Sequence, residues 1–272
     1  MQSFSVSLRA MLASLVRHRG LVWTMVRREV AGRYRGSVMG LLWSLFNPIF
    51  MLTVYTFVFS VVFKARWNVG SDSRTEFALM LFAGLMVFSL FSECLSRAPG
   101  LVVGNSNYVK KVIFPLDILP WVALGSAFFH FAVSLAVWLI AFVFIFGWPP
   151  LTILLLPLVL LPLVLLTLGL SWLLASLGVF LRDVGQVVAV LIPVLMFMSP
   201  IFYPMSALPE NFQAYLLLNP LTLIIEQARG VMYLGQLPEL RPLAVHGAVS
   251  LLIFWLGFAW FQKTRKGFAD VL

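Results

Sequence analysis

The chain is poor in charged residues, and one long stretch has none. Asp, Glu, Lys and Arg make up 11% of its 272 residues, hydrophobic residues make up 61%, and the mean hydropathy is +1.00. No Asp, Glu, Lys or Arg occurs between Asp117 and Arg182. One bilayer crossing takes about 20 apolar residues, so this run fits two crossings joined by a turn at Gly147-Trp148-Pro149-Pro150. The absence of charge excludes a water-soluble domain here.

Motifs that carry enzyme chemistry are also absent. The sequence has no G-x-x-x-x-G-K-S/T phosphate loop, no H-E-x-x-H zinc motif and no G-x-S-x-G nucleophile elbow. No acidic residues cluster for metal or diphosphate binding. The single cysteine, Cys94, excludes an internal disulfide and a C-x-x-C metal site, and we expect it to be a small buried residue. We predict no catalytic residue, no metal site and no cofactor in this chain.

The apolar runs hold almost none of the ionisable groups that couple a carrier to protons or sodium. His130 and His246 are the exceptions, and each is expected to be a hydrogen-bonded structural histidine rather than a proton relay. Glu93 is expected at the cytoplasmic end of the second run. If the chain transports, its energy must therefore come from elsewhere, and ATP hydrolysis by a partner is the leading candidate.

The net charge of +9 does not indicate a nucleic-acid partner. The basic residues flank apolar runs, which is typical of topology signals and of contacts with lipid headgroups. We predict membrane lipids as partners and no nucleic acid.

Six charge-free runs predict an all-α integral membrane protein with a six-span domain over residues 36–262. The predicted spans are residues 38–63, 77–92, 118–146, 151–181, 184–203 and 242–262. Of the 19 Lys and Arg residues, 14 lie in the termini and in the connections on the same side, and five lie on the other side. By the positive-inside rule, both termini, including the tail 263–272, are predicted to be cytoplasmic.

Two segments outside the spans carry their own signals. Residues 1–35 are predicted to form a basic amphipathic helix on the cytoplasmic headgroups, with Gly20 interrupting its apolar pattern. Residues 204–240 are apolar but are broken by Pro209, Asn219-Pro220 and Gly230, so they are too interrupted to span. Two short re-entrant helices between spans five and six are predicted, and a surface-lying amphipathic helix is the alternative.

Three groups of short sequence segments follow one another in a characteristic order along the chain. They are Arg33-Tyr34-Arg35-Gly36-Ser37-Val38-Met39-Gly40-Leu41-Leu42-Trp43 with Asn47-Pro48; Asn107-Tyr108-Val109-Lys110-Lys111-Val112-Ile113-Phe114-Pro115 with Ile118-Leu119-Pro120; and Phe180-Leu181-Arg182-Asp183-Val184 with Ser199-Pro200-Ile201-Phe202-Tyr203, Asn219-Pro220-Leu221 and Arg229. In this order, across residues 27–230, the chain resembles the permease subunit of type-2 ABC exporters for polysaccharides and polyol phosphates, the Wzm-like O-antigen exporters among them.

The resemblance implies a permease rather than an enzyme. It implies a homodimer bound to two copies of a separate ATPase that carries ATP and Mg, with a channel at the dimer interface. It implies export of an undecaprenyl-linked polysaccharide of the O-antigen type across the cytoplasmic (inner) membrane. Capsule or teichoic-acid export stays open within the same family. An integral-membrane enzyme acting on polyprenyl-linked glycans is a further alternative, disfavoured by the missing carboxylate cluster.

The cytoplasmic connection from Arg97 to Asp117 is the expected docking segment for that ATPase. A short helix is predicted around residues 105–112, capped by Asn105 or Ser106 and limited by Pro115. The lysines of this helix can meet acidic groups of the ATPase or simply set the topology. The residues predicted for ATPase coupling are Asn107, Tyr108, Lys110, Lys111 and Phe114.

The first and fifth spans are predicted to line the channel. Small and polar residues share one face of the first span, which either packs against another helix or borders an aqueous path. Aromatic rings stack on the apolar C–H faces of sugars, so aromatics at these positions suit a glycan conduit, although lipid-facing aromatics are equally ordinary. The predicted lining residues are Ser44, Asn47, Met51, Tyr55, Phe59, Met198, Phe202 and Tyr203.

Four arginines precede the first span. Guanidinium groups match phosphate oxygens, so Arg27, Arg28, Arg33 and Arg35 are predicted to receive the diphosphate head group of the lipid-linked substrate. Binding of bulk anionic lipid is the alternative.

Overall fold

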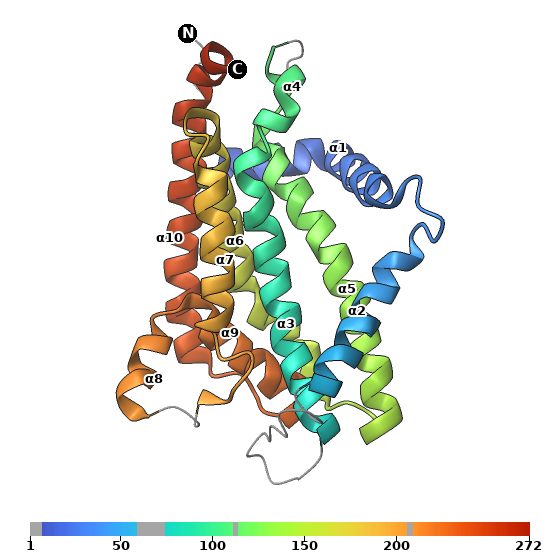
Figure 1. Ribbon diagram of the computed structural model, residues 1–272. Helices are drawn as coiled ribbons and strands as arrows, with labels where there is room; N and C mark the ends of the chain where they lie inside the picture. The colour runs from blue at the N-terminus through green and yellow to red at the C-terminus, as the bar shows by residue number, and fades with distance from the viewer. Residues whose placement is uncertain (1–6, 59–73, 111–113, 206–208) are drawn as a thin grey trace.

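The computed structural model describes residues 7–58, 74–110, 114–205 and 209–272, and every regular element in these ranges is helical (Figure 1). Phe59 and Lys111, two of the predicted site residues, lie outside the described residues. The α-helices are α1 (Leu8–Tyr34), α2 (Leu42–Tyr55), α3 (Arg74–Arg97), α4 (Ser106–Lys110), α5 (Leu119–Phe146), α6 (Leu156–Phe180), α7 (Val184–Phe197), α8 (Glu210–Leu217), α9 (Pro220–Arg229), α10 (Leu240–Thr264) and α11 (Phe268–Val271).

Six apolar helices, one for each predicted run, form the bundle. The helical segments that contain α3, α5, α6 and α10 are long and apolar enough to cross a membrane. The helices α2 and α7 have 14 residues each. At about 1.5 Å per residue α7 is shorter than the roughly 30 Å hydrocarbon core, whereas the helical segment that contains α2 runs from Leu42 to Val58, where the described range ends. Successive bundle helices run in alternate directions, and the two ends of the chain lie at the same end of the bundle (Figure 1).

Helix boundaries differ from the charge-free runs in two places. The second run was expected at 77–92, but α3 extends from Arg74 to Arg97 because long charged side chains can sit at the ends of an apolar helix. The first run was expected from residue 38, but α2 begins at Leu42 because Gly36 and Gly40 have positive φ values of 84° and 50°. The connection before α2 is therefore a series of turns. The end of α5 at Phe146, directly before the Gly-Trp-Pro-Pro sequence, is as predicted.

The tightest helix pair in the bundle is α6 with α10. Their backbones meet at two glycines: a Cβ on Gly257 would collide with the Gly169 carbonyl, and a Cβ on Gly169 would lie 2.6 Å from the Ile253 carbonyl oxygen. Without a side chain at these positions, the backbones approach closely enough for close van der Waals packing, which drives helix association inside a membrane. These two helices form the most closely packed pair of the bundle.

Helix α1 lies across one end of the bundle rather than along it (Figure 1). It continues through Gly20, so the expected interruption there does not end the helix, since one glycine within a helix costs only about 1 kcal/mol. Its buried residues Val26 and Val30 pack on Val122 of α5. Its placement on lipid headgroups stays a prediction.

The segment between α7 and α10 contains two short helices, as predicted. Helix α8 is largely exposed, with Tyr215 67% accessible, whereas α9 is inserted between the bundle helices. Asn219 caps α9 by accepting a hydrogen bond from the Leu221 amide at 3.0 Å. How deeply the pair enters a bilayer stays a prediction.

Arg229, at the end of α9, is buried and anchors this segment. It donates to the carbonyl oxygens of Met80, Pro200 and Ile201 at 2.9, 2.5 and 2.8 Å, and it pairs with Glu226 at 2.9 Å. Burial lowers the pKa of Arg229 to about 10, so the guanidinium remains charged at neutral pH. One side chain therefore joins α9 to α3 and to the end of the α7 segment.

Candidate functional site

A polar cleft of about 480 Å³ opens between α2, α3 and α5. Ser44, Asn47, Met51 and Tyr55 of α2 line one wall. The structure thus brings four of the predicted lining residues together because they recur at intervals of three and four along one helix. Their role in a channel stays a prediction.

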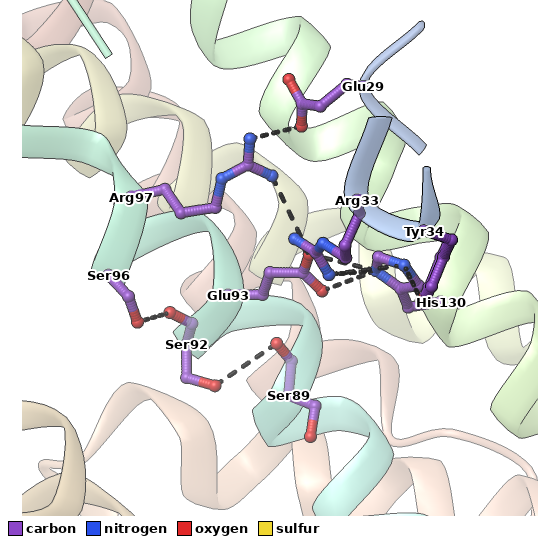
Figure 2. A network of polar contacts seen from close by, with 9 residues as sticks. All are labelled: Glu29, Arg33, Tyr34, Ser89, Ser92, Glu93, Ser96, Arg97 and His130. Carbon is purple, nitrogen blue, oxygen red and sulfur yellow. Dashed lines mark hydrogen bonds and ion pairs between the residues drawn. The ribbon is translucent and has the colours of Figure 1, made fainter. Parts of the chain in front are cut away.

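The opposite wall, on α3, changes from apolar to hydroxyl-bearing along its length. Its apolar part includes Phe82 and Met86, and it is followed by Ser89, Ser92 and Ser96, which also line the cleft. The Ser92 hydroxyl donates to the Ser89 carbonyl at 3.3 Å, and the Ser96 hydroxyl donates to the Ser92 carbonyl at 2.5 Å (Figure 2). Each hydroxyl oxygen can still accept a hydrogen bond, so the wall offers uncharged acceptors beside apolar surface.

A cluster of charged side chains forms the rim of the cleft where α1, α3 and α5 meet (Figure 2). Arg33 Nη2 donates to Glu93 Oε1 at 2.6 Å. His130 Nδ1 lies 3.0 Å from both oxygens of the same carboxylate. Glu93 therefore lies near the end of α3 and contacts side chains of two other helices, α1 and α5. Its placement on the cytoplasmic side stays a prediction.

Tyr34 completes the surroundings of His130. The Tyr34 hydroxyl lies 3.1 Å from His130 Nε2. If Nδ1 carries a proton that it donates to Glu93, Nε2 accepts from Tyr34. Arg33 Nη1 also lies 3.1 Å from Nδ1 and 3.4 Å from Nε2. Burial raises the pKa of Tyr34, which keeps the phenol protonated as that donor. His130 is hydrogen-bonded, as predicted, and three of its neighbours are ionisable.

A second ion pair runs beside the first. Arg97 Nη2 pairs with Glu29 Oε1 at 2.5 Å, and Arg97 Nη1 lies 3.9 Å from Glu93 Oε1. Glu29 and Arg33 are one turn apart on α1, and Glu93 and Arg97 are one turn apart on α3. The two helices are therefore joined by two ion pairs of opposite orientation.

The four arginines predicted to bind phosphate do not form one site. Arg33 lines the cleft, whereas Arg27, Arg28 and Arg35 are exposed and do not line it. Arg27 and Arg28 lie on a different face of α1 from Arg33, and Arg35 follows the end of the helix. Their contact with lipid headgroups stays a prediction.

The predicted lining residues beyond α7 lie away from the cleft. Phe202 stacks on Phe197 with ring centroids 5.5 Å apart, and the Tyr203 hydroxyl donates to the Phe197 carbonyl at 3.1 Å. Met198 is 54% exposed, and its carbonyl accepts from the Asn219 amide at 3.1 Å. In one chain only Met196 of α7 lines the cleft, so the structure does not join these three residues to the α2 wall.

The predicted coupling segment contains the short helix α4, preceded by a 3₁₀ turn at Val103–Asn105. The Asn105 side chain donates to the Leu101 carbonyl at 2.8 Å. Tyr108 and Phe114 stack with centroids 4.4 Å apart and pack partly on the core, while Asn107 is exposed. Lys110 is the last residue of α4. Binding of an ATPase here stays a prediction.

The sequence contained signals for two features that were not anticipated. Glu93 and His130 are ionisable residues in neighbouring predicted spans, and such residues generally pair, so their contact was open to prediction. The serines of α3 recur at intervals of three and four, the same spacing that singled out the α2 face. The pairing of Arg97 with Glu29 had no comparable signal because it depends on where α1 crosses the bundle.

Comparison with known proteins places these features in context. The family model for the ABC-2 type transporter matches residues 20–233. An O-antigen export system permease protein RfbA from Myxococcus xanthus is 30% identical, over 96% of this chain and 98% of its own length. A Klebsiella pneumoniae protein of the same name is 26% identical over 93% and 95%, and a polysialic acid transport protein KpsM from Escherichia coli is 24% identical over 88% and 91%.

Proposed function

The chain belongs to the ABC-2 type transporter membrane family, and from this premise we propose that it is the permease subunit of an exporter for lipid-linked polysaccharide of the O-antigen type. The observation that carries the proposal is the similarity to O-antigen export permeases over nearly the full length of both chains. A match of that extent includes the α2 wall, the rim cluster and the segment that contains α4.

The energy for export comes from a separate ATPase. The sequence has no phosphate loop of its own, and the bundle helices carry few groups that could couple transport to an ion gradient. The segment containing α4 lies at the same end of the bundle as both chain ends and α1 (Figure 1). That position suits docking of a soluble partner, with Asn107 and Lys110 meeting its acidic groups.

The chain is a multi-pass membrane protein, and its proposed topology has six spans: α2, α3, α5, α6, α7 and α10. The alternating directions of these helices support an even number of crossings (Figure 1). The excess of Lys and Arg on one side supports cytoplasmic termini and a place in the inner membrane. The short helix α7 fits a local thinning of the bilayer beside the cleft.

Two copies of the chain form the proposed channel. The cleft is bounded on one side by α2, whose outer surface carries exposed Trp43, Phe46 and Phe50. An apolar helix face beside an open polar cleft is suited to packing on a second copy, which would close the cleft into a conduit. Met198, Phe202 and Tyr203 would then lie toward its outer end.

The cleft surface suits a sugar chain that must slide. Sugar hydroxyls can donate to the serine oxygens of α3, while sugar C–H faces contact Tyr55 and Met51. The α2 row carries no charged residue, and the charged residue of the α3 row is Glu93, between Ser92 and Ser96 at the rim. The remainder of both walls therefore holds no charged position that would bind the chain strongly. Charges occur only at the rim, where the lipid head group would arrive.

Capsule export is the second candidate, because the polysialic acid transport relatives also match over most of the chain. Their identity is lower than that of the Myxococcus O-antigen relative, and they cover less of the chain, which favours the O-antigen class.

Deletion of the gene in its host tests the proposal. We expect loss of surface polysaccharide together with accumulation of lipid-linked polysaccharide on the cytoplasmic side, and recovery when the chain is supplied in trans. If surface polysaccharide persists at the wild-type level, or if only its synthesis stops, the proposed export function is wrong.

A further inference from the structure

One carboxylate at the rim of the cleft is surrounded by cationic or protonatable side chains from three helices. Glu93 lies 2.6 Å from Arg33 Nη2, 3.0 Å from His130 Nδ1 and 3.9 Å from Arg97 Nη1. Figure 2 shows these groups converging on the Glu93 side chain. Their donors come from α1, α5 and α3, so the arrangement depends on the fold.

The donors around Glu93 outnumber what one carboxylate uses. Arg97 Nη1 is buried, and no hydrogen-bond acceptor among the described residues is within bonding geometry of it. A buried guanidinium nitrogen is unfavourable to leave without an acceptor. The cluster is therefore arranged for an anion with more oxygens, spread more widely, than the two of Glu93.

Phosphate meets that description. Its oxygens accept charge-assisted hydrogen bonds from guanidinium forks, and a diphosphate spans two such groups. Arg33, Glu93 and His130 all line the cleft, so a head group could reach them from the open side. Arg97 lines a neighbouring pocket with Glu29 and Ser96, and its Nη1 lies 3.9 Å from Glu93 Oε1, so it is reached from the cleft once Glu93 moves aside. Tyr55 and Met51 line the same cleft and offer apolar surface there.

We propose that Arg33, Arg97 and His130 form the binding site for the diphosphate head group of the lipid-linked substrate, and that Glu93 occupies this site as an internal substitute until the substrate displaces it. The inference rests on the proposed function, because the head group is that of the exported lipid. Glu29 stays paired with Arg97 and keeps that guanidinium in place during the exchange.

Because Glu93 already occupies the site, a ligand must carry more negative charge than this one carboxylate to displace it. A membrane phospholipid carries one phosphate diester with a single negative charge, no more than Glu93 already supplies from within the protein. A diphosphate carries more charge and more acceptors, so it gains contacts that Glu93 cannot make, including the one to Arg97 Nη1. Glu93 thus excludes abundant anionic lipids and admits the diphosphate.

Binding to the purified complex of the chain with its ATPase tests this proposal, with the ATPase subunits saturated with ADP. Three probes are compared: farnesyl diphosphate, inorganic pyrophosphate and vesicles of phosphatidylglycerol. Removal of one opposing charge corresponds to about a tenfold change in Kd. Glu93→Gln should bind farnesyl diphosphate about tenfold tighter and should also gain affinity for phosphatidylglycerol. Arg97→Gln should bind farnesyl diphosphate about tenfold more weakly.

Arg28→Gln is the matched control, since Arg28 is an exposed arginine on α1 outside the cluster, and its Kd should equal that of the wild type. If Glu93→Gln does not fold, Glu93→Asp takes its place in the test. It keeps the charge on a shorter side chain, so its affinity for farnesyl diphosphate should lie between that of the wild type and the tenfold gain expected for Glu93→Gln. Pyrophosphate binding as tight as farnesyl diphosphate binding would overturn the assignment to a lipid.

Unchanged affinity in the properly folded Glu93 and Arg97 variants would overturn the site itself. These outcomes are separate from those of export. If the complex exports polysaccharide but the Kd values of the Glu93 and Arg97 variants equal that of the wild type, only this inference is rejected. If the Kd values change as expected but the complex exports no polysaccharide, the proposed function is rejected and the phosphate site remains.

Discussion

Asp117 and Arg265, 148 residues apart in the sequence, meet at 3.3 Å where the connection after α4 passes the end of α10. The other oxygen of Asp117 accepts from the Ser14 hydroxyl of α1 at 2.6 Å. Arg265 also donates to the Phe114 carbonyl at 2.8 Å. Asp117 therefore joins α1, the proposed ATPase-docking segment and the end of α10.

Replacing Asp117 with Asn removes its ion pair with Arg265. Because both side chains are largely buried, we expect a loss of about 1–3 kcal/mol in stability, seen as a lower thermal unfolding midpoint of the purified chain. Ser14→Ala removes only the hydroxyl contact and should cost about 1 kcal/mol. Equal effects of the two changes would show that the ion pair contributes nothing.

The Asp117 contacts also predict a change in coupling. In the complex, Asp117→Asn should hydrolyse ATP at near the wild-type rate while exporting less polysaccharide per ATP, because movement of the docking segment no longer reaches α1 and α10. Export and hydrolysis reduced in the same proportion would contradict this role.

The close approach of α6 and α10 predicts a sharp difference between two glycines of α10. Gly257→Ala places a methyl group against the Gly169 carbonyl and should destabilise the chain by about 1–3 kcal/mol. At Gly247 the nearest atom to an added Cβ is Pro162 Cγ at 3.8 Å, an ordinary contact, so Gly247→Ala should stabilise the chain by up to about 1 kcal/mol through helix propensity. Thermal unfolding of both variants in one detergent is the measurement.

Much of this fold follows from the sequence alone. The six apolar runs become the six bundle helices, because a charge-free run of that length has no alternative to a helix in a bilayer. The Gly-Trp-Pro-Pro turn was likewise encoded locally, by glycine and proline. The α4 helix was predicted as well, although the Asn105 side chain donates to the Leu101 carbonyl rather than to the start of α4. Local signals of this kind depend on neighbours in the chain and are visible before folding.

The rim cluster could not be assembled in the same way. Arg33 was predicted to face phosphate together with Arg27 and Arg28, but the helical period places Arg33 on another face of α1, a separation that the sequence could have shown. Glu29 and Arg97 meet only because α1 crosses the end of α3 at that turn. Crossing positions depend on packing between distant segments, such as Val26 and Val30 on Val122, which no periodicity along the chain specifies.

The cleft predicts a role for one aromatic ring. Tyr55→Ala removes a ring that lines the cleft and should lower polysaccharide export several-fold, with the permease still assembled with its ATPase. Thr53→Ala is the control, because Thr53 is exposed on the same helix and does not line the cleft. If Tyr55→Ala exports polysaccharide at the wild-type level, the Tyr55 ring has no role in export.

Charge reversal in the docking segment predicts a loss of ATPase binding. Lys110→Glu with Lys111→Glu should weaken co-purification of the ATPase about tenfold or more while the chain still inserts in the membrane. Arg17→Glu with Arg19→Glu makes the same change in net charge on α1 and should leave co-purification intact. Retention of the ATPase by the lysine variant would reject docking at these lysines.

The most direct test of the account is vectorial movement of lipid-linked polysaccharide in proteoliposomes. Vesicles containing the chain with its ATPase should move the glycan across the bilayer only during ATP hydrolysis. Vesicles containing the chain with a hydrolysis-deficient ATPase, or the chain alone, should move none. Sustained one-directional movement by the chain alone would contradict the proposal that a partner supplies the energy.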